Sequence, residues 1–281
     1  MSAKILLSDC QMNYDKLKRY LLPNMRVLIL PYSNYRYFLN NDEGFEELWD
    51  FNNGREFNDI AKQLNKFGIE KGNISVINPL KDNLEFILDK MDRVNIIYLT
   101  GGNPKDFMYF TPYEVMDKLY YSNKVLMGTS AGSMVLCKEF FMYKGAEEDQ
   151  LKDEICYGLG LINNMIIVHY NGEQKQTKAI ESLRFKFGYS GFVDCIEDGD
   201  CVVIDDMDKK EEKTNMEYLV DLMYQTIENN IICNPYLGFD GMFRSRIDND
   251  IKKDYKFSDM YSYQPPKKIG LINKIKSFFI K

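Results

Sequence analysis

Short apolar segments alternate with amphipathic ones along the first half of the chain. Residues 27–30, 96–99 and 125–127 are hydrophobic at every position, and segments with helical spacing separate them. A strand that is apolar throughout is typical of a parallel sheet covered on both faces. The alternation predicts an α/β fold of three layers, with a mostly parallel sheet between helices on both faces. Within one of the helical segments, 107–120, Pro112 predicts a break.

The second half of the chain is less regular. Residues 165–169 form an apolar segment that ends in a histidine and predict a further buried strand. Residues 194–196 and 201–204 flank an acidic turn at 197–200, a pattern typical of a β-hairpin. Residues 138–158 are polar and acidic, and we expect them at the surface near the turn that follows residues 125–127.

That turn has the sequence Gly128-Thr129-Ser130-Ala131-Gly132 and fits the G-x-S-x-G nucleophile elbow. A sharp strand-to-helix turn exposes the serine hydroxyl, and the flanking glycines let neighbouring backbone pass without a Cβ clash. The N-terminus of the following helix favours developing negative charge. The simpler alternative is a Gly/Ser turn without function. The strand before it and the helix after it favour Ser130 as a nucleophile.

A serine nucleophile needs a base, usually a histidine oriented by a carboxylate. The chain contains one histidine, so an imidazole base has to be His169. Glu197 and Asp198, in the turn after the next predicted strand, are the candidate carboxylates. A buried histidine bonded to a backbone carbonyl and an ordinary Asp-Gly turn are the alternatives. The position of His169 downstream of the elbow serine favours a functional role for the histidine. Whether the turn at 197–200 has a role is left undecided.

Acyl transfer also needs two N–H groups that converge on the developing oxyanion. The N–H of Ala131, directly after the candidate nucleophile, is one candidate. The turn Gly101-Gly102-Asn103 is the second, because glycine allows close backbone approach. A plain connection between strand and helix is the alternative for this turn.

Composition narrows the function classes. The net charge of −6 argues against a broad nucleic-acid interface. No apolar segment approaches the roughly 18 residues that a membrane helix needs, and the N-terminal residues lack a signal-peptide pattern. The six cysteines show neither CxxC nor zinc spacing, which favours reduced thiols. We therefore expect a cytoplasmic protein without a metal ion or cofactor.

Five motifs follow one another along the chain: Ile29–Tyr32, Leu99–Asn103, Gly128–Ser133, Gly158–Ile162 and Val168–Tyr170. In order and spacing they resemble the peptidase E family of serine peptidases (dipeptidase E, also called aspartyl dipeptidase), whose wider group includes cyanophycinase. The resemblance covers about residues 4–206. It implies a fold like that of class I glutamine amidotransferases.

The resemblance also implies roles for individual residues. Ser130 corresponds to the nucleophile, His169 to the base, and Gly102 and Ala131 to the oxyanion hole. The family's acid is a glutamate directly before a glycine. Asp198 stands there in this chain, with Glu197 one residue earlier.

Family members that favour an N-terminal aspartate use an arginine after the histidine strand. Lys178 stands at the corresponding helix start here, and Arg184 lies one to two turns further on. A lysine pairs with a carboxylate as a point charge, without the bidentate geometry of arginine. Asn103 and Lys178 are the candidate substrate-binding residues.

These inferences predict a serine exopeptidase that hydrolyses short peptides, with N-terminal Asp dipeptides as one candidate class. A cyanophycinase-like or isopeptide hydrolase, or a non-catalytic binding or regulatory module on the same fold, are the alternatives. We expect residues 1–206 to form the catalytic domain and 207–281 a C-terminal extension whose role the sequence does not indicate. No nucleic acid or membrane span is expected, and homo-oligomerisation stays open.

Overall fold

The computed structural model describes residues 3–41, 43–145, 150 and 152–205 of the 281-residue chain. The predicted extension at 207–281 lies outside the described residues, so the domain boundary stays a prediction. None of the helices in the described ranges is long and apolar enough to cross a bilayer.

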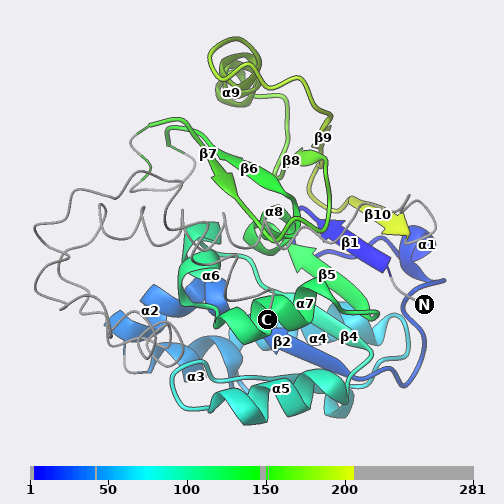
Figure 1. Ribbon diagram of the computed structural model, residues 1–281. Helices are drawn as coiled ribbons and strands as arrows, with labels where there is room; N and C mark the ends of the chain where they lie inside the picture. The colour runs from blue at the N-terminus through cyan, green and yellow to red at the C-terminus, as the bar shows by residue number, and fades with distance from the viewer. Residues whose placement is uncertain (1–2, 42, 146–149, 151, 206–281) are drawn as a thin grey trace, which may run out of the picture. The chain divides into compact units, whose positions relative to one another are not determined.

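A six-stranded sheet forms the centre of the fold (Figure 1). Its strands, in spatial order, are β10 (Cys201–Asp205), β1 (Ala3–Leu7), β5 (Val125–Thr129), β4 (Ile96–Leu99), β2 (Val27–Leu30) and β3 (Ile74–Val76). All neighbours are parallel except β10, which pairs antiparallel with β1 at one edge. The prediction of a mostly parallel sheet with helices is confirmed.

Helices cover the sheet on both faces, which explains why β1, β2, β4 and β5 are buried at every position. One face packs its alternate side chains, such as Ile5, Ile29 and Tyr98, against Trp49 and Leu64 of the flanking helices. The helices and helical turns of this α/β part are α1 (Tyr14–Leu17), η1 (Tyr32–Asn34), α2 (Tyr35–Asn40), α3 (Gly44–Trp49), α4 (Arg55–Asn65), η2 (Lys71–Asn73), α5 (Leu84–Asp92), α6 (Pro104–Phe110), α7 (Tyr113–Tyr120) and α8 (Ala131–Leu136). The predicted break at Pro112 is confirmed, because α6 ends and α7 begins on either side of it.

A smaller layer lies beside the end of the sheet where α8 begins. It contains the antiparallel pair β6 (Glu139–Met142) and β7 (Glu154–Tyr157), the parallel pair β8 (Met165–Ile167) and β9 (Val193–Cys195), and α9 (Gln174–Phe185). These elements share a small core of their own, formed by Phe141, Met165, Ile167, Ala179 and Leu183. We refer to them as the upper layer, since they lie at the top of Figure 1.

Two predictions for this part of the chain are wrong. Residues 194–196 and 201–204 do not form a hairpin: β9 pairs with β8, and β10 pairs with β1. Pairing with β10 covers an edge of the main sheet that a local hairpin would leave open. Residues 138–158 are not simply surface loop, because Phe140, Phe141 and Met142 are buried.

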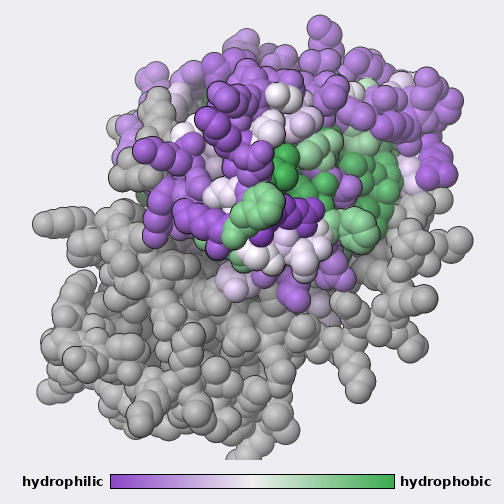
Figure 2. All heavy atoms as spheres, turned by 90° about the horizontal axis from the view of Figure 1, so that it is seen from above, coloured by the Kyte–Doolittle hydropathy of each residue, from purple (hydrophilic) through white to green (hydrophobic). Residues whose placement is uncertain are grey.

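From above, the described part of the molecule presents mostly hydrophilic side chains, with hydrophobic ones gathered in one area (Figure 2). The carboxyl ends of β1, β4 and β5 lie side by side in the main sheet. In open α/β sheets this end is where ligands bind. The residues that follow these three strands therefore define the place to look for a site.

Candidate active site

Ser130 lies between the end of β5 and the start of α8 in a strained backbone conformation. Its φ of 49° and ψ of −114° are unusual for a residue with a side chain. Its N–H donates to the carbonyl of Leu7 at 3.0 Å, which ties the turn to the end of β1. Such strain persists only where the surrounding structure enforces it, and it concentrates at functional sites.

The two glycines of the motif are required by close backbone packing. A Cβ atom on Gly132 would lie 2.1 Å from the carbonyl oxygen of Leu99. A Cβ on Gly128 would lie 2.4 Å from the carbonyl of Gly132. Both contacts are with backbone, which cannot move aside as a flexible side chain can. The glycines thus let β5, α8 and the end of β4 approach closely enough to form the turn.

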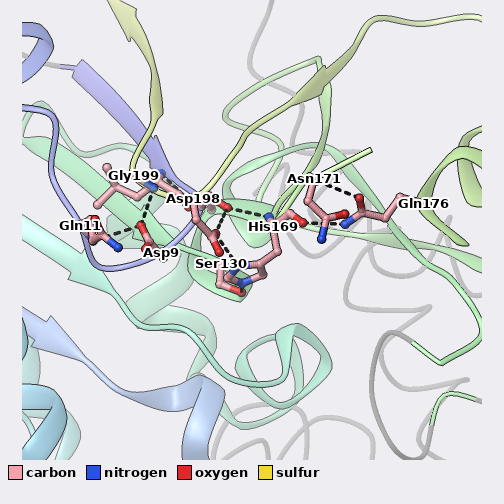
Figure 3. Close-up of polar contacts among 11 residues, drawn as sticks. Asp9, Gln11, Ser130, His169, Asn171, Gln176, Asp198 and Gly199 are labelled. Carbon is pink, nitrogen blue, oxygen red and sulfur yellow. Dashed lines mark hydrogen bonds and ion pairs between the residues drawn. The ribbon is translucent and has the colours of Figure 1, made fainter. Parts of the chain in front are cut away.

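His169 connects Ser130 to Asp198 (Figure 3). Its Nε2 lies 2.9 Å from Ser130 Oγ, and its Nδ1 lies 2.7 Å from Asp198 Oδ1. Since a carboxylate only accepts hydrogen bonds, Nδ1 carries the proton and Nε2 is free to accept one from the serine. The imidazole is half-exposed, and His169 follows β8 with a φ of 53°. Three residues far apart in the sequence thus form one hydrogen-bonded chain.

Of the two candidate carboxylates, Asp198 is the one that meets the imidazole. Glu197 is exposed to solvent. The turn that carries Asp198 is held by Asp9, whose Oδ1 accepts the N–H of Gly199 at 3.0 Å (Figure 3). Partial burial raises the pKa of Asp198, but hydrogen bonds from Ser8 and His169 outweigh it and hold that pKa below its usual value. The carboxyl is therefore ionised and able to orient the histidine.

Sequence reasoning missed Ser8 and Asp9. Both follow β1 directly, and Ser8 is fully buried. The signal that was available is their position at the carboxyl end of a predicted parallel strand. This position predicts that the two residues lie near the site. It does not predict which residues they contact, because those residues are about 160 to 190 positions away in the chain.

The turn after β4 lies against Ser130. A Cβ on Gly101 would be 3.6 Å from the Cβ of Ser130. Gly102 has a φ of 123°, and a Cβ there would meet the carbonyl of Ser33 at 2.5 Å, so this position requires glycine. Ala131 is the first residue of α8, and helix geometry leaves its N–H without a partner inside the helix. The roles of Gly102 and Ala131 in an oxyanion hole stay predictions.

The two predicted substrate-binding residues lie apart. Asn103 caps α6, with its Oδ1 accepting the N–H of Lys105 at 2.9 Å, and its own N–H donates to Ser33. Lys178 is exposed on α9. Arg184 is engaged elsewhere, because it donates to the carbonyls of Tyr189 and Gly191 and so braces the loop before β9. Binding roles for Asn103 and Lys178 stay predictions.

In the part of the chain that the structure describes, no group of three or more His, Cys, Asp or Glu side chains is arranged to hold a metal ion.

Comparisons with solved structures bear on the fold. The chain superimposes on a peptidase from an acI-B1 Actinobacterium with a TM-score of 0.50 and 15% identity, covering 73% of this chain and 83% of that one. It superimposes on a protein assigned as a peptidase E from Listeria monocytogenes EGD-e with a TM-score of 0.51 and 14% identity, covering 76% and 100%. At these identities the likeness shows a common fold.

No curated protein matches the sequence. The family model of peptidase family S51, in contrast, matches residues 56–211, more than half of the chain. The matched residues include the elbow turn, the histidine and the carboxylate. The chain belongs to peptidase family S51 and is a peptidase.

Proposed function

We propose that the protein is a serine peptidase whose catalytic triad is Ser130, His169 and Asp198. The observation that carries this proposal is the hydrogen-bonded chain from Ser130 Oγ through the imidazole to Asp198 Oδ1, at 2.9 and 2.7 Å. Nucleophile, base and orienting acid have these mutual positions in serine hydrolases of unrelated folds. The same geometry favours catalysis over a purely binding role for this fold.

In the proposed reaction, Ser130 Oγ attacks the carbonyl carbon of the scissile bond while His169 Nε2 takes the hydroxyl proton. The N–H groups of Gly102 and Ala131 stabilise the oxyanion that forms. His169 then gives its proton to the leaving amine, and the C–N bond breaks to leave an ester on Ser130. Water then attacks this ester while His169 takes its proton. The acyl part of the substrate leaves as a carboxylic acid, and the Ser130 hydroxyl is restored.

The proposed substrates are short peptides, cleaved near one end. The resemblance to dipeptidase E and the structural neighbour assigned as a peptidase E support this class. Lys178, exposed on the helix that follows the His169 loop, offers a positive charge for a substrate carboxylate. We therefore infer that peptides with an N-terminal aspartate are the first substrates to test.

A fluorophosphonate probe tests the serine mechanism without knowledge of the substrate. The wild-type protein is expected to be labelled on Ser130, and Ser130→Ala to remain unlabelled. Heat-denatured wild type is the control for non-specific reaction. If the native wild type is not labelled, or if Ser130→Ala is labelled equally, the proposal is wrong.

A panel of Asp-Xaa, β-Asp-Xaa and neutral dipeptides tests the substrate class by release of the amino acid. Activity on α-Asp-Xaa, together with an increase in KM in Lys178→Met, is the expected result. Cleavage confined to β-linked peptides would replace this class by an isopeptide hydrolase.

A further inference from the structure

Ser8 makes a contact that joins the base and the acid of the proposed triad. Its hydroxyl donates to Asp198 Oδ1 at 2.8 Å and accepts the backbone N–H of His169 at 2.6 Å. The geometry points to Ser8 as a positioning residue, whose hydroxyl keeps the imidazole of His169 and the carboxylate of Asp198 aligned with each other. This inference rests on the proposed function and adds a fourth side chain to it.

The Ser8 hydroxyl that makes this contact is buried. Ser8 has no exposed surface, whereas the side chains of His169 and Asp198 are 49% and 55% exposed. A hydroxyl has one proton to donate and lone pairs to accept. Here the proton is donated to the carboxylate, and a lone pair accepts the N–H of His169. The buried hydroxyl thus fixes two groups that water would otherwise solvate and loosen.

Ser8 follows a residue that contacts the proposed nucleophile. The preceding residue, Leu7, accepts the N–H of Ser130 through its carbonyl at 3.0 Å. Two consecutive residues at the end of β1 therefore bond the backbone of Ser130, the backbone of His169 and the carboxylate of Asp198.

His169 needs such an anchor. Its φ of 53° is costly for a residue with a side chain, so its backbone must be held from outside. Ser8 accepts its N–H, and Gln176 donates to its carbonyl at 2.6 Å. Ser8 is the one of these two that also touches Asp198. Ser8 lies outside residues 56–211, so the family match does not include it.

The experiment compares Ser8→Ala and Ser8→Cys with Ser182→Ala. Ser182 is a control, because its hydroxyl also donates to a carboxylate, that of Asp153 at 2.7 Å, in the layer that carries His169 but without contacting the proposed triad. One readout is the rate of fluorophosphonate labelling of Ser130. The second is the long-range ¹H–¹⁵N correlation spectrum of His169, the one histidine in the chain, which reports the fraction of the Nδ1–H tautomer.

We expect Ser8→Ala to slow labelling about 10- to 100-fold, because a misplaced base loses its alignment with the serine. The fraction of the Nδ1–H tautomer should fall in the same variant. Ser8→Cys, whose thiol is a weaker donor of similar shape, should lie between Ser8→Ala and wild type in both readouts. Ser182→Ala should match wild type in both.

The outcomes separate this inference from the proposed function. A labelled wild type with unchanged rate and spectrum in Ser8→Ala overturns the positioning role alone. An unlabelled wild type overturns the proposed function, and the tautomer fraction then decides the role of Ser8 by itself. If Ser8→Ala does not fold, as judged by thermal unfolding, Ser8→Cys supplies both readouts, and wild-type values in that variant overturn the inference.

Discussion

The main sheet holds Ser130, the proposed nucleophile, and the upper layer holds His169, the proposed base. β5 and α8, on either side of Ser130, are buried at every position. No Cβ fits at Gly128, which lies against the backbone of α8, or at Gly132, which lies against the end of β4. His169 follows β8 in a layer with a small core, and its side chain is half-exposed. Asp198 lies in the connection between β9 of the upper layer and β10 of the main sheet.

Close packing thus fixes the half of the site around Ser130, and hydrogen bonds fix the half that contains His169 and Asp198. Packing in a dense interior is intolerant of even one added atom. Hydrogen bonds near the surface can open locally while the rest of the structure stays folded. Changes around Ser130 should therefore destabilise the whole fold. Changes at His169 or Asp198 should lower activity while the protein stays folded.

The largest loss of activity in a folded variant is expected for Asp198→Asn. An amide in place of the carboxylate favours the wrong imidazole tautomer, so the rate of peptide hydrolysis or labelling should fall about 10⁴-fold with the fold intact. The matched control is Glu197→Gln, which removes the adjacent exposed carboxylate and should keep the rate within about twofold. An equal loss in Glu197→Gln would assign the acid to the other residue.

The next effect tests packing around the nucleophile. Gly132→Ala places a Cβ against the backbone of Leu99 and should lower the free energy of unfolding by about 4 kcal/mol or more. Gly101→Ala, in the neighbouring turn with its nearest contact at 3.6 Å, should change it by less than about 1 kcal/mol. Urea unfolding of both variants measures the difference. Similar values for the two would show that close backbone packing does not fix this half of the site.

The smallest of the three effects concerns the upper layer. Leu183→Ala should cost about 3 kcal/mol and raise amide hydrogen exchange in β8 and β9 while β4 and β5 stay protected. The control is Leu64→Ala, an equally buried leucine that packs against the main sheet and should raise exchange across that sheet. Exchange that rises together in both layers in Leu183→Ala would mean that they open as one unit.

Much of the fold follows from local pattern. Apolar segments of strand length, the helices between them and the break at Pro112 depend on neighbouring residues, and the structure has them where the sequence predicts them. Partner choice does not depend on neighbours alone. The residues flanking the 197–200 turn have the local sequence pattern of a hairpin. Their actual partners, β8 and β1, depend on how distant strands pair.

The same division applies to the site. The turn motif predicted Ser130 as the nucleophile, and His169 was predicted as the base because the chain has no other histidine. The choice between Glu197 and Asp198 as the partner of the imidazole, and the contact of Ser8 with both His169 and Asp198, became visible in the folded chain. The physical reason is distance along the chain: hydrogen bonds across 29, 39, 161 and 190 residues depend on how the two layers pack, which no local pattern encodes.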